Sequence, residues 1–354
     1  MDVQRRAAVV LTLELEYQHQ LLITIRRLFR RRRRRAPRWW VRPWLTPDRR
    51  LEYSHYNRLM QELRMEDEKA FANYVRMPPH MFDELLNRII PVIQRRDTHR
   101  ETSPRCPRMK LAMTLRHLAT GDRYHTIQYD FRCGYSTVVW IVQEVCQAII
   151  QELKDEVMLL PRTQEDCKDI AQQFQDRWNV PHALGALDGK HIAIRKPHNS
   201  GSVFFNYKEL KECIGDNTIN FPDSDRLPND DRDTAYYILG DDAFPLRTFL
   251  MKPYGRRGLD NDMLVANYRL SRGRRVVENG FGILANRWRC FLGTLEHGPD
   301  VVRLLVEAGV ILHNLLRIRF PATGNADVDR EDEDHTNIPG AWRADQQVEE
   351  IPQF

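Results

Sequence analysis

The sequence predicts an α/β fold preceded by an all-helical region. Residues 52–178 show helical periodicity, short apolar runs begin at Pro181, and helical patterning returns from Asn267. Strands followed by helices are typical of an α/β layer, and 354 residues suffice for two domains or for one domain with appendages. We expect four segments: a basic leader (1–51), a helical domain (52–178), an α/β domain (179–321) and an acidic, disordered tail (322–354).

Charge is distributed unevenly along the chain. The formal net charge is only +5, yet arginines crowd residues 26–38 and acids crowd residues 327–335. A basic arm with an acidic tail favours a polyanionic partner and solvated ends. The arginine run is interpreted as a nuclear import signal or as a direct phosphate-binding arm, and the two are compatible. We therefore expect a nuclear protein, with the cytoplasm as the alternative.

Cysteine usage and hydropathy exclude several classes of protein. The six cysteines form no Cys-x-x-Cys pair, so neither a disulfide framework nor a zinc ribbon is predicted. No apolar run reaches the roughly 18 residues of a membrane span, and no membrane partner is expected. The apolar residues 21–25 are too short for a signal peptide core and precede the arginines.

The helical region has the spacing of a helix-turn-helix unit. Residues 80–93 and 109–121 each predict one helix, the second with Gly121 as its C-cap. Residues 124–150 predict a short helix, a turn at 132–134 and a long helix capped by Ser136. Because this spacing is weakly specific, a generic helical bundle is the alternative. The second helix is mostly apolar, which disfavours base recognition along its length.

Two apolar runs each end in an aspartate. Asp188 closes the run that begins at His182, and Asp241 closes the run that begins at Thr234. A charged aspartate in an apolar setting needs a partner, a metal or an exposed strand end. Ligands in open α/β sheets sit at the carboxyl ends of parallel strands. The alternative is that both aspartates only cap turns.

Glu278 supplies a third acid on a predicted helix. Val276, Val277, Phe281 and Leu284 form the expected buried stripe, which places Glu278 at its border. From that border the carboxylate can reach a metal held by two strand-end aspartates. Mg²⁺ prefers such oxygen ligands, and paired ions assist phosphodiester cleavage. Taken alone, three acids are a weak signal in a chain that contains 49.

Longer motifs carry a more specific signal. The stretches "GALDGKHIAIRKP" from Gly185, "SGSVFFNYK" from Ser200, "LPNDDRDTAYYILGDDAFPLRTFLMKPY" from Leu227 and "YRLSRGRRVVENGFGILANRWRCF" from Tyr268 resemble the PIF/Harbinger transposases and the domesticated Harbinger transposase-derived nucleases. So does the stretch from Asp97 to Ile149, and the resemblance covers residues 52–321. It implies a ribonuclease-H-like nuclease domain after a helix-turn-helix-like domain. It also implies divalent-metal-dependent DNA cleavage by a DDE triad.

The resemblance assigns the site residues. It implies that Asp188, Asp241 and Glu278 are both the catalytic residues and the metal ligands, with Mg²⁺ as the expected ion and Mn²⁺ as the alternative. Asp242 is a weaker candidate, because the pleat of a strand sends adjacent side chains to opposite faces. A Myb-like DNA-binding protein is the partner that the resemblance implies.

Basic residues beside these acids predict contact with DNA. Phosphate neutralisation dominates the affinity of proteins for nucleic acids, and an ordinary charged helix face is the alternative. His191 and His198 flank Asp188 and are expected to be structural or to face phosphate. The residues predicted to bind DNA are Lys190, Arg272, Arg274, Arg275 and Arg287.

The chain departs from the family pattern after Lys208. There the family continues into two apolar strands and a turn that bears a further aspartate, whereas this chain passes directly to Glu209. The implied strand order 3-2-1-4-5 would be reduced to the parallel remnant 1-4-5, with Asp188 and Asp241 still on neighbouring strands. The loss motivates an alternative function, that of a catalytically inactive, domesticated DNA-binding or scaffold protein.

Overall fold

The structure is a computed structural model that describes residues 18, 20–24, 41–94, 106–195, 221–245, 247–255, 257–321, 328–331 and 337–344. The chain divides into two compact units, Met1–Thr46 and Pro47–Phe354. The first unit includes the short 3-10 helix η1 (Pro43–Leu45). The predicted arginine run, His198 and the predicted gap after Lys208 lie outside the described residues.

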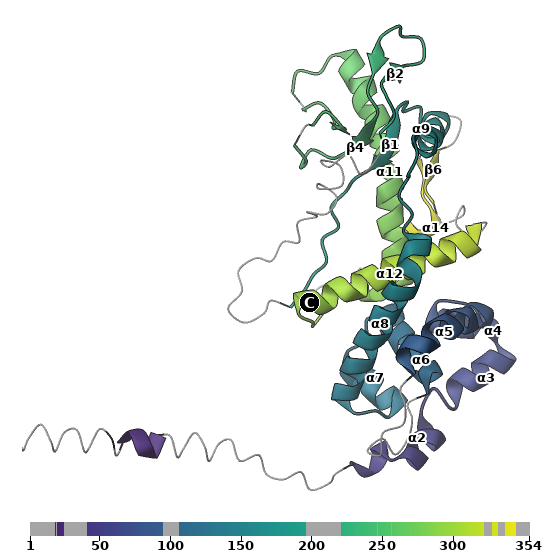
Figure 1. The fold of residues 1–354 in the computed structure, drawn as a ribbon, viewed down its shortest axis with the longest axis vertical. Coiled ribbons are helices and arrows are strands. Elements are labelled where there is room, and N and C mark those ends of the chain that lie inside the picture. Colours follow the sequence, from purple (N-terminus) through teal and green to yellow (C-terminus); the bar gives the residue numbers. More distant parts are fainter. Residues whose placement is uncertain are drawn as a thin grey trace, which may run out of the picture. The chain divides into compact units, whose positions relative to one another are not determined.

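Helices make up most of the second unit (Figure 1). Among the described residues the strands are short and belong to one three-stranded sheet and two two-stranded hairpins. The helices are α2 (Pro47–Tyr53), α3 (Leu59–Glu66), α4 (Glu68–Val75), α5 (Pro79–Ile93), α6 (Pro107–Thr120), α7 (Tyr124–Phe131), α8 (Tyr135–Val157), α9 (Gln164–Trp178), α11 (Asn261–Arg287), η2 (Arg289–Phe291), α12 (Pro299–Arg319) and α14 (Ala341–Ala344). The strands are β1 (Ala183–Ala186), β2 (Asp225–Arg226), β3 (Asp233–Thr234), β4 (Tyr237–Leu239), β5 (Leu250–Met251), β6 (Arg330–Glu331) and β7 (Asn337–Ile338).

Helix α8 is the centre of the larger hydrophobic core. Its buried residues lie on more than one face, as expected of a helix that is covered on several sides. Helices α5, α6 and α12 pack against it. Because α12 follows the predicted boundary between residues 178 and 179, the core crosses that boundary. Residues 52–178 share this core with later helices, and a separate helical domain over residues 52–178 stays a prediction.

Helices α7 and α8 are the pair predicted from residues 124–150. The turn places Arg132 in the left-handed region at φ 50°, and α8 begins after Gly134, without a side-chain cap. The predicted cap at Ser136 is therefore wrong, since Ser136 already lies inside the helix. Glu144 accepts a hydrogen bond from the buried Lys110 Nζ at 2.9 Å, so its side chain binds within the protein.

Helices α7 and α8 are also the part of the described chain to compare with a membrane span. Among the described residues, no single helix is long and apolar enough to cross a bilayer. Only α7 and α8 taken together reach the required length and composition, and they are bent by 101° at the intervening turn.

The three-stranded sheet has the parallel order β1-β4-β5, and Figure 1 labels its neighbouring strands β1 and β4. Helices α9 and α11 pack on it. The order agrees with the predicted 1-4-5 remnant, in which the strand before Asp188 neighbours the strand before Asp241. Beyond β1, residues 191–195 form no strand and make a single bridge, Ile194 with Leu295. The loss of strands stays a prediction.

Candidate active site

Asp188 and Asp241 follow neighbouring parallel strands. Ala186 on β1 is paired with Leu239 on β4, and each aspartate lies two residues beyond its member of that pair. The pairing extends past β1, because Leu187 N donates to Leu239 O at 2.7 Å. Both aspartates are therefore at the carboxyl edge of the sheet, where ligands bind in open α/β folds.

Asp188 has a cationic partner on α11. Arg274 Nη2 lies 3.4 Å from Asp188 Oδ1, and the two side chains are 15% and 22% exposed, respectively. Partial burial strengthens such a pair relative to a surface ion pair, because fewer water molecules screen it. The guanidinium therefore occupies one oxygen of the Asp188 carboxylate.

Asp241 is held by its own turn. Its Oδ1 accepts a hydrogen bond from Ala243 N at 3.0 Å, the contact of an aspartate that stabilises a local turn. The side chain is half-buried, whereas the adjacent Asp242 is exposed. In this structure Asp241 therefore caps a turn, as the alternative interpretation of the sequence expected. A carboxylate has two oxygens, so the second oxygen of Asp241 is available to another ligand.

Glu278 lies on α11, one helical turn beyond Arg274, and is exposed. The predicted buried stripe is wrong, because Val276 is 41% exposed. Small residues decide which face of α11 packs: a Cβ at Gly273 would lie 2.5 Å from Leu239 Cδ1. The helix approaches β4 closely at Gly273. With this glycine facing β4, larger apolar residues of α11 such as Val276 are left exposed. The buried residues of α11 are Leu270, Gly273, Asn279, Gly282, Ile283 and Ala285.

The three carboxylates have suitable chemistry for a divalent cation but do not fit one as placed. Asp and Glu oxygens are the ligands that Mg²⁺ prefers. In the part of the chain that the structure describes, however, no three His, Cys, Asp or Glu side chains are grouped closely enough to hold a metal ion. Asp188 is paired with Arg274 instead. The convergence of Asp188, Asp241 and Glu278 on a shared ion stays a prediction.

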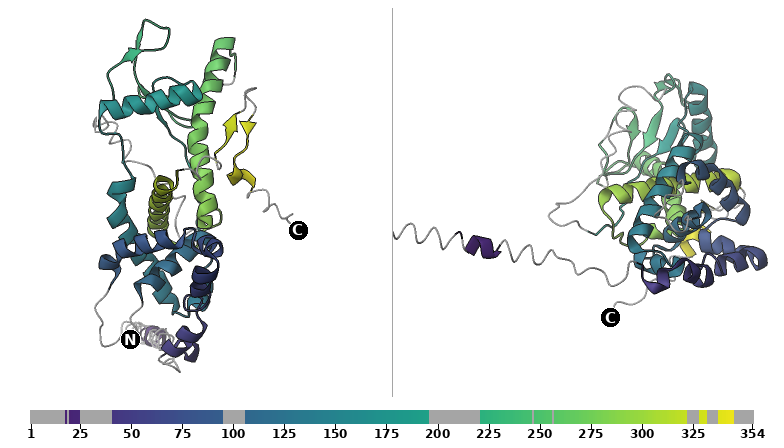
Figure 2. Two further views of the ribbon diagram at one scale, coloured as in Figure 1. Left: turned by 90° about the vertical axis from the view of Figure 1, so that its right-hand side faces the viewer. Right: turned by 60° about the horizontal axis from the view of Figure 1, so that its bottom comes forward.

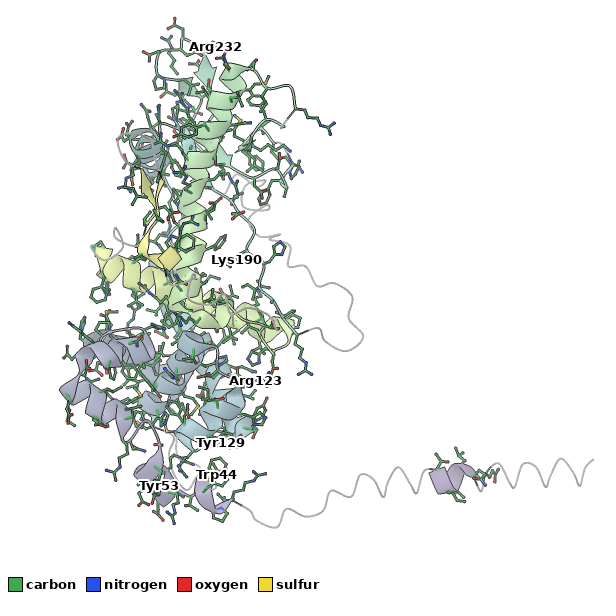
Figure 3. All side chains as sticks on the ribbon, turned by 180° about the vertical axis from the view of Figure 1, so that it is seen from behind. Trp44, Tyr53, Arg123, Tyr129, Lys190 and Arg232 are labelled. Atoms are coloured by element: carbon green, nitrogen blue, oxygen red, sulfur yellow. The ribbon has the colours of Figure 1, made fainter. Side chains whose placement is uncertain are left out.

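The predicted DNA-binding residues differ in their surroundings. Lys190 and His191 are exposed in the segment after β1, where Figure 3 labels Lys190. The four arginines are half-buried. Arg272 lies over the ring of Tyr268 at 5.8 Å, and Arg274 is paired with Asp188. Contact between these residues and DNA stays a prediction, and the exposed Lys190 needs the least rearrangement to make it.

Replacing Arg274 is expected to destabilise the protein. Arg274→Gln leaves the Asp188 carboxylate without its cation in a partly buried place, which costs about 1–3 kcal/mol of unfolding free energy. Urea denaturation followed by circular dichroism measures the loss. Arg269→Gln, an exposed position on the same helix, is the matched control and should change little. Equal midpoints for the two variants would contradict the pairing.

The C-terminal segment holds residues that the sequence analysis missed. Part of the predicted disordered tail is ordered, because Asp329 and Trp342 are buried and β6, β7 and α14 are formed. For the described residues between 328 and 344 the prediction is therefore wrong. The signal was Trp342, an aromatic side chain in an otherwise polar and acidic stretch, since a large apolar side chain gains by burial.

Comparison with known proteins adds an independent observation. Residues 223–314 match the family model described as DDE superfamily endonuclease. This segment contains Asp241 and Glu278, whereas Asp188 precedes it. No solved structure matches the chain.

Relatives are found among plant and animal proteins. The chain is 22% identical over 247 residues to "Protein ALP1-like" of Arabidopsis thaliana, covering 58% of this chain and 60% of that protein. It is 25% identical over 204 residues to human "Putative nuclease HARBI1", covering 49% and 57% of the two chains. The Xenopus laevis protein of that name is 21% identical over 293 residues, covering 75% and 83%.

The chain spans about three fifths of the first two of these relatives. The predicted resemblance is confirmed by the family model and by the names of the relatives. Residues 223–314 match a DDE superfamily endonuclease domain, and the chain is similar to the plant ALP1-like protein and to the proteins named putative nuclease HARBI1.

Proposed function

We propose that this protein is a transposase-derived DNA endonuclease that requires a divalent cation, Mg²⁺ or alternatively Mn²⁺, and that Asp188, Asp241 and Glu278 are its catalytic residues. The observation that carries the proposal is the placement of Asp188 and Asp241 at one edge of a parallel sheet on which α11, the helix of Glu278, packs. The match to the DDE superfamily endonuclease model supports the same reaction class.

The surroundings of the acids suit a phosphate substrate. Arginines at 272, 274 and 275 precede Glu278 on α11, and cations near a phosphodiester neutralise its charge. Arg274 has two competing partners under this proposal, the Asp188 carboxylate of the free protein and a phosphate of bound DNA. Release of Arg274 from Asp188 is the rearrangement that the proposal requires, because the acids as placed do not hold a cation.

The cellular setting belongs to the same proposal. A nuclear location suits a DNA substrate and is supported by the arginine run at residues 26–38 as an import signal, with the cytoplasm as the alternative. A Myb-like DNA-binding protein is the proposed partner, on the strength of the family resemblance alone.

Nicking of supercoiled plasmid DNA tests the function. The purified protein with Mg²⁺ is expected to convert supercoiled to open-circular DNA, and EDTA should stop the conversion until excess Mg²⁺ is added. Nicking that continues in EDTA would contradict the metal requirement. DNA binding with a steep salt dependence but without nicking would overturn the proposal in favour of the inactive DNA-binding protein.

A further inference from the structure

The C-terminal segment lies along the half of α11 that carries Glu278. Figure 2 shows the hairpin of β6 and β7 beside the long helix, and α14 contacts α11. We call Asp329, Gly340, Trp342 and Arg343 the C-terminal clasp. Asp329 precedes β6, Gly340 lies between β7 and α14, and Trp342 and Arg343 belong to α14. Their contacts connect the parts of the C-terminal segment to one another and attach the segment to α11.

Asp329 anchors the clasp from within. Its side chain is 1% exposed and accepts hydrogen bonds from Arg343 Nε at 3.0 Å, from Arg343 Nη2 at 2.6 Å and from Gly340 N at 2.8 Å. Burial raises the pKa of Asp329, but the bonds from Arg343 and Gly340 outweigh it, so the pKa is below its usual value. A buried carboxylate of this kind is stable only while its partners remain in place.

Trp342 attaches the clasp to one face of α11. Its Nε1 donates to Asn279 Oδ1 at 2.9 Å, and its carbonyl oxygen accepts a hydrogen bond from Asn286 Nδ2. The indole covers Gly282, where a Cβ would lie 2.5 Å from Trp342 Cε3. Positions 279, 282 and 286 are spaced by three and four residues and share a face of the helix. Only glycine at position 282 allows the ring to approach this closely.

Arg343 connects α14 to Asp329. The guanidinium lies over the Trp342 ring at 4.3 Å while it binds Asp329, which fixes its plane. The pKa of Arg343 is raised, first by the hydrogen bond to Asp329 and in smaller part by the charge of Glu278. The Arg343 side chain is 41% exposed, so one side of it remains open towards solvent.

The clasp therefore acts on the turn of α11 that contains Glu278. Asn279, its immediate neighbour, accepts hydrogen bonds from both Trp342 Nε1 and Asp329 N. Without the clasp this turn would lose the partners of Asn279 and the cover over Gly282, and the rotation of the helix about its axis would be less fixed. The direction of the Glu278 side chain depends on that rotation.

We propose that the C-terminal clasp is a working part of the candidate active site, and that Arg343 is a positioning residue for Glu278. The clasp fixes the turn that carries Glu278, because Arg343 holds Asp329, and Asn279 accepts hydrogen bonds from Trp342 Nε1 and from Asp329 N. The role of Arg343 in the reaction rests on the proposed nuclease function, whereas the docking of the clasp does not.

Hydrogen exchange of the full-length protein, followed by mass spectrometry, tests the docking. In Arg343→Ala the amides of residues 275–287 are expected to exchange at least about 10-fold faster, because a buried carboxylate loses its partner. Arg232→Ala is the matched control: Arg232 binds Asp230 through the same atoms, but the pair is local and exposed (Figure 3). Amides of α8 should be unchanged in both variants, which shows that the proteins are folded. Equal exchange of residues 275–287 in wild type and Arg343→Ala would overturn the docking.

Nicking kinetics test the positioning role. Arg343→Ala is expected to lower kcat at least about 10-fold with little change in KM for DNA, and Arg343→Lys should restore part of it, since lysine keeps the charge. Loss of α11 protection with unchanged kcat would overturn the positioning role and leave a structural one. A wild-type protein that does not nick DNA would overturn the proposed function and with it the role of Arg343, whereas the exchange measurement would still decide the docking.

Discussion

Asp188→Asn is expected to reduce Mg²⁺-dependent nicking of supercoiled DNA by at least about 100-fold, more than the loss usual for a residue that acts through another. Asparagine keeps the volume and one carbonyl oxygen of the side chain but removes its negative charge. Asp188 lies at the carboxyl end of β1, in register with Asp241 beyond β4, so no described neighbour on β1 can replace its carboxylate. Initial rates of plasmid conversion measure the effect.

The matched control for this variant is Asp231→Asn. Asp231 is fully exposed beyond β2 and lies outside the candidate site, so its replacement should leave nicking unchanged. Circular dichroism of both variants shows whether each retains its fold. Equal rates for Asp188→Asn and the wild type would contradict the assignment of Asp188.

The free energy of unfolding is expected to fall steeply between about pH 6.5 and pH 4, because two buried histidines must take up protons. The pKa of His117 and that of His313 are each lowered from 6.5 to about 4. Burial is the main cause for both. The charge of His297 lowers the His117 value further, against the opposing contact with Asp122, and Arg287 and Arg317 lower the His313 value.

The sign of the pH effect follows from the direction of these shifts. A histidine whose pKa is lower in the folded protein stabilises the fold fully above its unfolded value, and this contribution is lost as the pH falls towards the folded value. Each pKa unit corresponds to about 1.4 kcal/mol, so each histidine should remove about 2 kcal/mol between pH 7 and pH 5. Carboxylates with lowered pKa values, such as Asp83 and Asp329, take up protons and reduce the free energy of unfolding only at lower pH.

Urea denaturation at pH 7 and pH 5 measures this loss in the wild type and in His313→Gln. The variant should show a smaller difference between the two pH values, and His125→Gln, at an exposed position, should behave as the wild type. The same stability at both pH values, or the same slope in His313→Gln, would contradict the burial of neutral histidines.

Local patterns in the sequence predicted the elements that depend on near neighbours. The apolar spacing of residues 80–93 corresponds to α5, and Gly121 ends α6 at φ 73°. The two apolar runs that end in Asp188 and Asp241 correspond to β1 and β4. In each case the residues that decide the structure lie within one or two turns or strand lengths of each other, so periodicity contains the needed information.

Long-range packing could not be predicted in the same way. The buried face of α11 follows Gly273 and Gly282, which admit Leu239 and Trp342, whereas a pattern weighted by size favours Val276. The partner of Asp188 is an arginine 86 residues later, and the partners of Trp342 lie 56 and 63 residues earlier. Such pairings depend on the tertiary fold, and the local periodicity of the sequence contains no information about them.

Binding of Mn²⁺, followed by electron paramagnetic resonance in the presence of DNA, tests most directly whether Asp188, Asp241 and Glu278 share a cation. The proposed function predicts binding by the wild type, with affinity lowered at least about 10-fold in each of Asp188→Asn, Asp241→Asn and Glu278→Gln, but not in Asp231→Asn. Equal affinity in the wild type and the three site variants would show that these carboxylates do not hold a common ion, and would contradict the proposed site.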